Sequence, residues 1–147
     1  MIQAENFDNG ARGVAWADTD AINSGGKYRV NTGVDIAATT DVGGGYMVGA
    51  TRAREWMNYT VNVAKAGTFT FDIRQAMAST GGAFHIEVDG KNVSGALAFK
   101  NTGGWQTWGD VTKAGIAMTA GKHTIRIVID SVSRAGIGAN INWIKIV

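Results

Sequence analysis

The stretch 68–77, Thr-Phe-Thr-Phe-Asp-Ile-Arg-Gln-Ala-Met, alternates side chains with a period of two for ten residues. This period places Phe69, Phe71 and Ile73 on one face of a β-strand, with Thr, Asp and Arg side chains on the other. The same period recurs at residues 2–5, 55–63, 83–89, 124–130 and 141–146. Almost no segment has helical periodicity, so the sequence predicts an all-β chain of about nine or ten short strands.

Glycine makes the turns of this chain, which has 21 glycines and no proline in 147 residues. Asp89-Gly90 and the segment 65–67 each follow a predicted strand closely, as tight turns do. Short strands at intervals of about 8–12 residues are typical of a sandwich of two antiparallel sheets. Residues 8–45 lack alternation and are rich in Gly, Asn, Asp and Thr, so we expect long binding loops there. No repeat or linker divides the chain, and we expect one domain over residues 1–147.

Composition excludes several classes of protein. The 14 basic residues are scattered and the net charge is +2, which argues against a nucleic-acid partner. The absence of cysteine excludes disulfides and cysteine-ligated zinc. No stretch approaches the roughly 18 apolar residues of a membrane span. No signal peptide precedes Ile2, and we expect a monomeric module cut from a longer, secreted protein of bacterial type.

The run 102–108, Thr-Gly-Gly-Trp-Gln-Thr-Trp, carries the strongest functional signal. Two glycines precede Trp105, and a tryptophan in such a loop is well placed to offer a flat apolar face to a sugar ring. Asn140 carries both a hydrogen-bond donor and an acceptor, which suits adjacent sugar hydroxyls. Tyr46 follows three glycines and is either a third ligand contact or a half-buried residue at the start of a strand.

Oxygen-bearing side chains suggest calcium. Gln3 and Glu5 share one face of the first strand, and Asn142 lies on the last strand, so the three converge if the chain ends pair. The alternative is that they are ordinary polar residues on an exposed strand.

A second set of oxygen donors lies in the long loops. It consists of Asp18, Asp20, Asn23 and Asp35. These residues hold a second calcium ion, or they form a solvated turn with local Asx hydrogen bonds.

Catalysis finds little support in the sequence. Glycoside hydrolysis requires two carboxylates roughly 5–10 Å apart, and no motif pairs Glu55, Glu87 or Asp110. His85 and His123 fall within strand alternations, where surface positions are expected. The chain has no nucleophile elbow, P-loop or dinucleotide fingerprint, so we expect a protein that is not an enzyme.

Six segments, in this order along the chain, resemble the family 6 carbohydrate-binding modules. They are residues 2–7, 44–49, 55–61, 102–108, 120–126 and 140–144. The loop from Gly13 to Ile36 is similar to the branch found beside marine-type agarases and laminarinases. The resemblance implies a jelly-roll β-sandwich that binds polysaccharide without cleaving it and holds an attached enzyme on its substrate.

The resemblance also implies roles for particular residues. A structural calcium ion would be bound by Gln3, Glu5 and Asn142, together with a backbone carbonyl near Tyr46. In the family's main site two aromatic side chains clamp one sugar and an asparagine fixes its hydroxyls. Trp105 and Asn140 match one aromatic and the asparagine.

The position of the second aromatic is occupied here by Ala50. The site is therefore expected to be a one-sided platform unless Tyr46 or Trp16 supplies the missing wall. We expect weak binding to a galactan such as agarose, a β-glucan or a xylan. The alternatives are a small polysaccharide-degrading enzyme on the same sandwich, or an adhesion or structural domain without affinity for glycans.

Overall fold

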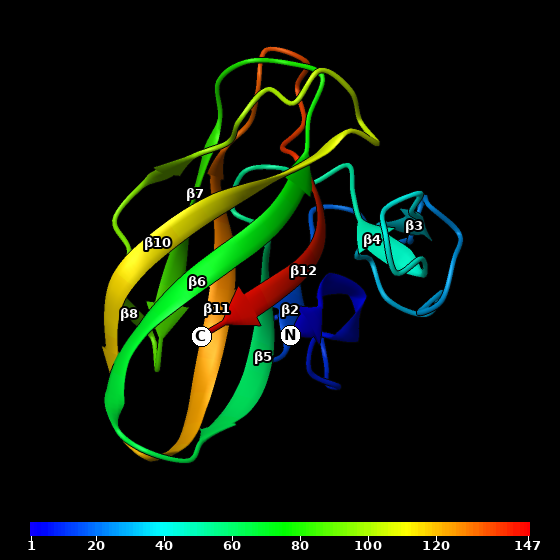
Figure 1. The fold of residues 1–147 in the computed structure, drawn as a ribbon. Helices are drawn as coiled ribbons and strands as arrows, with labels where there is room; N and C mark the ends of the chain where they lie inside the picture. The colour runs from blue at the N-terminus through cyan, green and yellow to red at the C-terminus, as the bar shows by residue number, and fades with distance from the viewer.

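The structure is a computed structural model that describes residues 1–147, and it consists of two six-stranded antiparallel sheets (Figure 1). One sheet contains β10 (Trp108–Met118), β6 (Gly67–Ala76), β12 (Asn140–Ile146), β4 (Tyr46–Val48), β3 (Ile36–Ala38) and β1 (Ile2–Gln3). The other contains β2 (Trp16–Ala17), β5 (Trp56–Val63), β11 (Gly121–Ser131), β7 (Ala83–Val88), β8 (Lys91–Asn92) and β9 (Leu97–Ala98). The predicted all-β sandwich is confirmed.

The alternating stretches build the core. On β6, the side chains of Phe71 and Ile73 are fully buried, and the apolar rows of β7 and β11 face them from the other sheet. Gln75 follows in the same buried row because its Nε2 donates to the Lys100 carbonyl oxygen over 2.9 Å. The period of two alone therefore identified which side chains lie between the sheets.

The strand β10 lies outside the alternating stretches found in the sequence. Its pairing with β6 shifts between Lys113 and Ile116, where Gly115 takes a positive φ of 83°. Such a bulge interrupts the period of two and hides the strand from pattern analysis. The first strand is also shorter than expected, because the chain turns into the 3-10 helix η1 (Ala4–Asn6) directly after Gln3.

The two chain ends lie side by side, as predicted. β1 pairs with β12 in antiparallel register, with Ile2 opposite Ile144 and Gln3 opposite Trp143 (Figure 1). This pairing brings η1, which carries Glu5, close to the strand that carries Asn142.

His123 lies between two hairpin turns and is only 9% exposed, which corrects its expected surface position. Its Nδ1 is 2.6 Å from an Asp89 carboxylate oxygen, and its Nε2 is 2.9 Å from the Thr119 carbonyl oxygen. The hydrogen bond to Asp89 is the main cause that raises the pKa of His123. Both ring nitrogens face acceptors, so the protonated ring links the β7–β8 turn to the β10–β11 turn.

Stability should therefore depend on the charge of His123. Because its pKa is raised above 6.5 in the folded state, its contribution is fully present below that value and is lost as the pH rises through the folded pKa. We expect the melting temperature to fall as the pH rises above 6.5, and His123→Gln to flatten this slope. Thermal melts of both proteins across this range check the prediction, which an unchanged slope in the variant would contradict.

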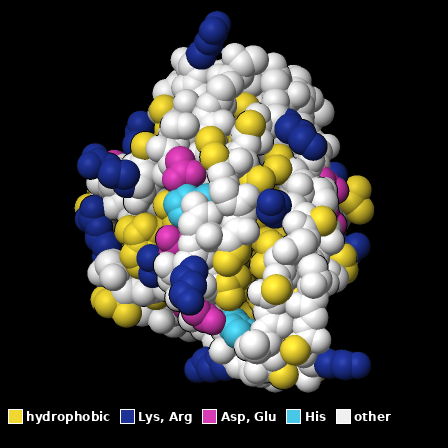
Figure 2. Space-filling model, turned by 90° about the vertical axis from the view of Figure 1, so that its left-hand side faces the viewer, with side chains coloured by type: hydrophobic (Ala, Val, Ile, Leu, Met, Phe, Trp, Pro, Cys, Tyr) yellow, Lys and Arg dark blue, Asp and Glu magenta, His cyan; other side chains and the backbone are white.

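Charged side chains do not gather into one basic patch on the face that Figure 2 shows, where Lys and Arg are scattered among apolar and uncharged groups. Histidine atoms on this face lie against carboxylates, in keeping with the pairs His85–Asp130 and His123–Asp89. No helix of the structure is long and apolar enough to cross a membrane.

Candidate functional site

A cleft of about 240 Å³ opens beside the β3–β4 hairpin, where the chain enters β12. Its lining includes Ser24, Asp35, Met47, Gly49, Ala50 and Asn140. Two of the residues predicted for ligand contact, Ala50 and Asn140, thus lie in one depression. We call this depression the hairpin cleft.

Asn140 is the first residue of β12 and is held firmly. Its Nδ2 donates to the Trp105 carbonyl oxygen over 2.7 Å. Its Oδ1 lies over Gly49, where a Cβ atom would approach it to 2.8 Å, so glycine makes room for this side chain. One N–H of the amide is occupied, so the second N–H and the acceptor oxygen remain for a ligand.

Trp105 lies in a loop that is fixed rather than flexible. Gln106 accepts hydrogen bonds from the backbone N–H and hydroxyl of Thr40 over 3.0 and 3.1 Å, and it donates to the Ala38 carbonyl oxygen over 3.2 Å. The Trp105 ring is half-buried and packs against the edge of the core. Sequence analysis missed Gln106, because a single glutamine between two tryptophans carries no signal.

Asp35 supplies a second acceptor to the hairpin cleft. One of its carboxylate oxygens accepts hydrogen bonds from the backbone N–H and the hydroxyl of Ser24, each over 2.5 Å. The other oxygen accepts none from the protein. Together with Oδ1 of Asn140, it gives the cleft two acceptors suited to hydroxyl donors. The sequence had placed Asp35 in a metal site instead.

Neither candidate for the missing second wall lies in the cleft. Trp16 is 7% exposed, because its ring is in the core and its Nε1 donates to the Gly10 carbonyl oxygen over 3.1 Å. Tyr46 is half-buried and stacks on Tyr28 with ring centroids 5.3 Å apart. Ala50 lines the cleft and leaves that side without an aromatic ring.

The first predicted metal set holds two buried oxygens without hydrogen-bond partners, Oε2 of Glu5 and Oδ1 of Asn142. Burial raises the pKa of Glu5, and the backbone N–H groups of Glu5 and Tyr46 oppose this. Orphaned buried oxygens are rare in folded proteins and call for a partner. Carboxylate and amide oxygens are the donors that calcium prefers, so the residues present fit a calcium ion. Gln3 pairs with Trp143, the neighbour of Asn142 on β12.

Asp41 belongs to the same region and was not predicted. Its carboxylate accepts two hydrogen bonds from Arg74, each over 2.8 Å, and one from Nδ2 of Asn142 over 2.8 Å. The Arg74 guanidinium is the main cause that holds the pKa of Asp41 at about 2. Asp41 thus orients the Asn142 amide so that its Oδ1 stays free.

The second predicted metal set is not assembled. Asn23 uses its side chain within the loop, accepting from Gly26 and Ile36 and donating to Lys27. Asp18 accepts from the Asp20 backbone over 2.8 Å, as in an Asx turn. No group of three or more His, Cys, Asp or Glu residues in the structure is placed to hold a metal ion. The alternative of a hydrogen-bonded turn describes these residues better, although Asp18 and Asn23 are buried rather than solvated.

Asp18 nonetheless has an unusual environment. Burial, with the nearby carboxylates of Glu55, Asp35 and Asp20, raises the pKa of Asp18 to about 7.

Comparison with known proteins identifies the family. The model of the carbohydrate binding module family 6 matches residues 24–147. This chain is a family 6 carbohydrate-binding module.

Solved structures agree with this assignment. The module is similar to the family 6 module of lichenase 5A from Cellvibrio mixtus, solved in complex with cellotriose, with 31% identity and a TM-score of 0.72 over 99% of this chain and 93% of that one. It is also similar to the C-terminal family 6 module of a marine laminarinase from Zobellia galactanivorans, with 28% identity and a TM-score of 0.71 over 99% and 95% of the two chains.

Among curated proteins, the module is 31% identical over 121 residues to the clotting factor G alpha subunit of Tachypleus tridentatus. The match covers 81% of the module but only 17% of that protein. The module therefore spans a small part of this relative's length.

The module's candidate catalytic carboxylates do not converge. Glu55 is fully engaged, with Thr19 on one oxygen and the Arg52 backbone N–H on the other. Glu87 faces Arg126 over 3.5 Å on one sheet, and Asp110 faces Arg74 over 3.1 Å on the other. Each carboxylate thus has its own partner, and no acid–base pair faces the hairpin cleft.

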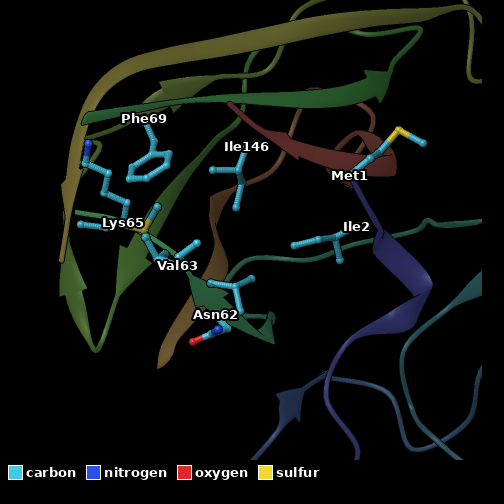
Figure 3. A pocket seen from close by; sticks show the side chains of 10 residues that line it. Met1, Ile2, Asn62, Val63, Lys65, Phe69 and Ile146 are labelled. Carbon is cyan, nitrogen blue, oxygen red and sulfur yellow. The ribbon is translucent and has the colours of Figure 1, made fainter. Parts of the chain in front are cut away.

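The module has a larger hollow of about 440 Å³ beside the β5–β6 turn. Figure 3 shows the side chains of Phe69, Ile146, Val63 and Ile2 around it. Eight of its ten lining residues are hydrophobic, and only Asn62 and Lys65 could orient a sugar by polar contacts.

Proposed function

We propose that this module binds a neutral polysaccharide in the hairpin cleft. The Trp105 ring does not itself line the cleft. The observation that carries the proposal is the hydrogen bond that ties the Trp105 backbone to Asn140 in the lining. A sugar ring stacks on the open side of Trp105, while Asn140 Oδ1 and Asp35 accept hydrogen bonds from its hydroxyls.

Binding through this cleft is expected to be weak. Ala50 leaves one side of the bound sugar open, and water competes for each of the few polar contacts. We therefore expect dissociation constants between about a micromolar and a millimolar. The cellotriose complex of the lichenase module favours a β-glucan among the expected ligands.

The module acts without catalysis and docks an attached enzyme on its substrate. The separate engagement of Glu55, Glu87 and Asp110 supports this role, as do the similar modules of a lichenase and a laminarinase. We place the parent protein outside the cell and the isolated module as a monomer.

One calcium ion stabilises the module. It binds Glu5, Asn142, Gln3 and the Tyr46 backbone carbonyl, and it holds the paired terminal strands against the loop before β4. The two orphaned buried oxygens support this assignment.

Titration calorimetry with cello-, laminari-, agaro- and xylo-oligosaccharides tests the binding proposal. Trp105→Ala should weaken binding at least tenfold, because a stacked aromatic contributes about 1.4 kcal/mol. Ala50→Trp should strengthen it by filling the open side. Trp56→Ala removes a half-buried indole on β5, in the sheet that does not contain β12, and serves as the control.

Four results would contradict the proposal. Unchanged affinity of Trp105→Ala would show that the sugar does not stack on Trp105. Unchanged affinity of Ala50→Trp would show that Ala50 leaves no gap. Failure of the wild-type module to bind any soluble oligosaccharide or to sediment with insoluble polysaccharide would favour an adhesion or structural role. Release of reducing sugars by the isolated chain would favour the alternative that the chain is itself a polysaccharide-degrading enzyme.

A further inference from the structure

Tyr28 is held in a backbone conformation that few side chains adopt. Its φ is 58°, in the left-handed region, and its side chain is 52% exposed. This conformation costs a residue with a bulky side chain on the order of 1–2 kcal/mol. The tyrosine is nevertheless fixed, because its hydroxyl donates to Asn6 Oδ1 over 2.7 Å and its ring stacks on Tyr46. An aromatic ring is thus held rigidly at the surface at a cost in backbone strain.

The ring borders a hollow of about 340 Å³ lined by Asn6, Phe7, Asn9, Tyr28 and Arg29. None of these residues lines the hairpin cleft. The Arg29 guanidinium lies 3.8 Å from the centroid of the Phe7 ring. It donates to the Phe7 carbonyl oxygen and, over 2.8 Å, to Asn9 Oδ1. These contacts fix a positive charge beside the aromatic ring.

The side-chain amide groups left free in this hollow are donors. Oδ1 of Asn6 accepts from Tyr28 and Oδ1 of Asn9 accepts from Arg29, whereas neither Nδ2 group has a partner in the protein. The carboxylate of Asp8 nearby is engaged by the backbone N–H and hydroxyl of Thr60, over 2.8 and 2.7 Å. Two amide donors and a guanidinium suit a group that only accepts hydrogen bonds and carries negative charge.

We propose that this hollow is a second saccharide site, selective for an acidic sugar. A sulfate or carboxylate group accepts hydrogen bonds from the Nδ2 groups of Asn6 and Asn9 next to the charge of Arg29. The pyranose ring carrying that group lies on the exposed face of Tyr28. The hairpin cleft has the Asp35 carboxylate where this hollow has the Arg29 guanidinium, so the two sites differ in the chemistry they recognise.

Two near-isosteric variants test the proposal. Asn9→Asp and Asn6→Asp keep the oxygen that accepts from Arg29 or Tyr28 but replace the free donor with a negatively charged acceptor. Binding is measured by calorimetry in calcium-containing buffer, with a κ-carrageenan tetrasaccharide, an oligogalacturonate and a neutral agaro-oligosaccharide as probes. Each aspartate variant should lose at least tenfold in affinity for the acidic probe. Affinity should also fall when salt is raised from about 50 to 500 mM, because salt screens the charge of Arg29.

Tyr28→Gly separates recognition from folding. Glycine accepts the left-handed backbone without strain, so the fold should be retained, as a thermal melt will show, while binding of the acidic probe weakens. Trp105→Ala removes the aromatic side chain proposed for the hairpin cleft and should leave binding of the acidic probe unchanged. This variant therefore separates a failure of the acidic-sugar proposal from a failure of the proposed binding in the hairpin cleft.

The probes distinguish the source of the negative charge. Tighter binding of the carrageenan would show that the hollow recognises a sulfate, and tighter binding of the oligogalacturonate that it recognises a carboxylate. Equal binding of both would show that it recognises negative charge of either kind. Three results would overturn the proposal: equal binding of the neutral probe at this site, undiminished binding by folded Asn9→Asp and Asn6→Asp, or no binding of either acidic probe.

Discussion

Chelation of calcium is expected to lower the melting temperature of the module by roughly 10 °C. An ion present at a hundredfold excess over its dissociation constant stabilises the folded state by about 3 kcal/mol, and a chain of this size shifts by about 2–4 °C per kcal/mol. The effect should be large here because Glu5 Oε2 and Asn142 Oδ1 have no other partner. Thermal melts in EDTA and in millimolar calcium measure the shift.

Glu5→Gln provides the matched control for this prediction. The variant keeps the shape of the side chain but removes the charge that attracts the cation, so its melting temperature should no longer respond to calcium. Magnesium should not substitute well, since it requires a more regular octahedron and releases its water reluctantly. If EDTA leaves the wild-type melting temperature unchanged, the module has no structural calcium at this position.

Gly25→Ala is expected to destabilise the module by about 3 kcal/mol and to abolish binding in the hairpin cleft. A Cβ atom at Gly25 would lie far inside contact distance of the Ile36 carbonyl oxygen and carbon. Backbone atoms of a strand cannot move aside as a flexible side chain can. The loop would therefore have to leave β3, taking Ser24 and its hydrogen bonds to Asp35 with it.

The adjacent Gly26→Ala separates steric contact from backbone strain. Gly26 has a φ of 66° but would bring its Cβ within 4 Å of no neighbouring atom. Its replacement should cost only about 1 kcal/mol and preserve binding. Chemical denaturation gives the stability of both variants, and calorimetry gives their affinity. Equal stability of the two variants would show that the segment 24–26 does not rest closely against β3.

Sequence was most informative where one local pattern decides the structure. The period of two in residues 68–77 identified Phe71 and Ile73 as core residues, because burial on one face of a strand requires no other information. The pairing of the chain ends could also be predicted from the sequence, since both ends of the chain have strand-like alternation. This pairing brings Glu5 and Asn142 into the same region of the fold.

Features that depend on contacts between distant segments were not predictable. The roles of Asp41 and Gln106 arise from partners 33 to 101 residues away, which no local pattern reveals. Trp16 does not supply the missing wall for the same reason, because the core encloses its ring. The strand β10 was missed because the bulge at Gly115 disrupts its alternation.

A single connection, residues 24–35, contributes to both proposed sites: Ser24, Gly25 and Asp35 face one, while Tyr28 and Arg29 face the other. An insertion or deletion there would change the specificity of both sites in one step without altering the strand order of the two sheets. The same coupling constrains engineering, since grafting a new preference into either surface by remodelling this stretch will disturb its counterpart.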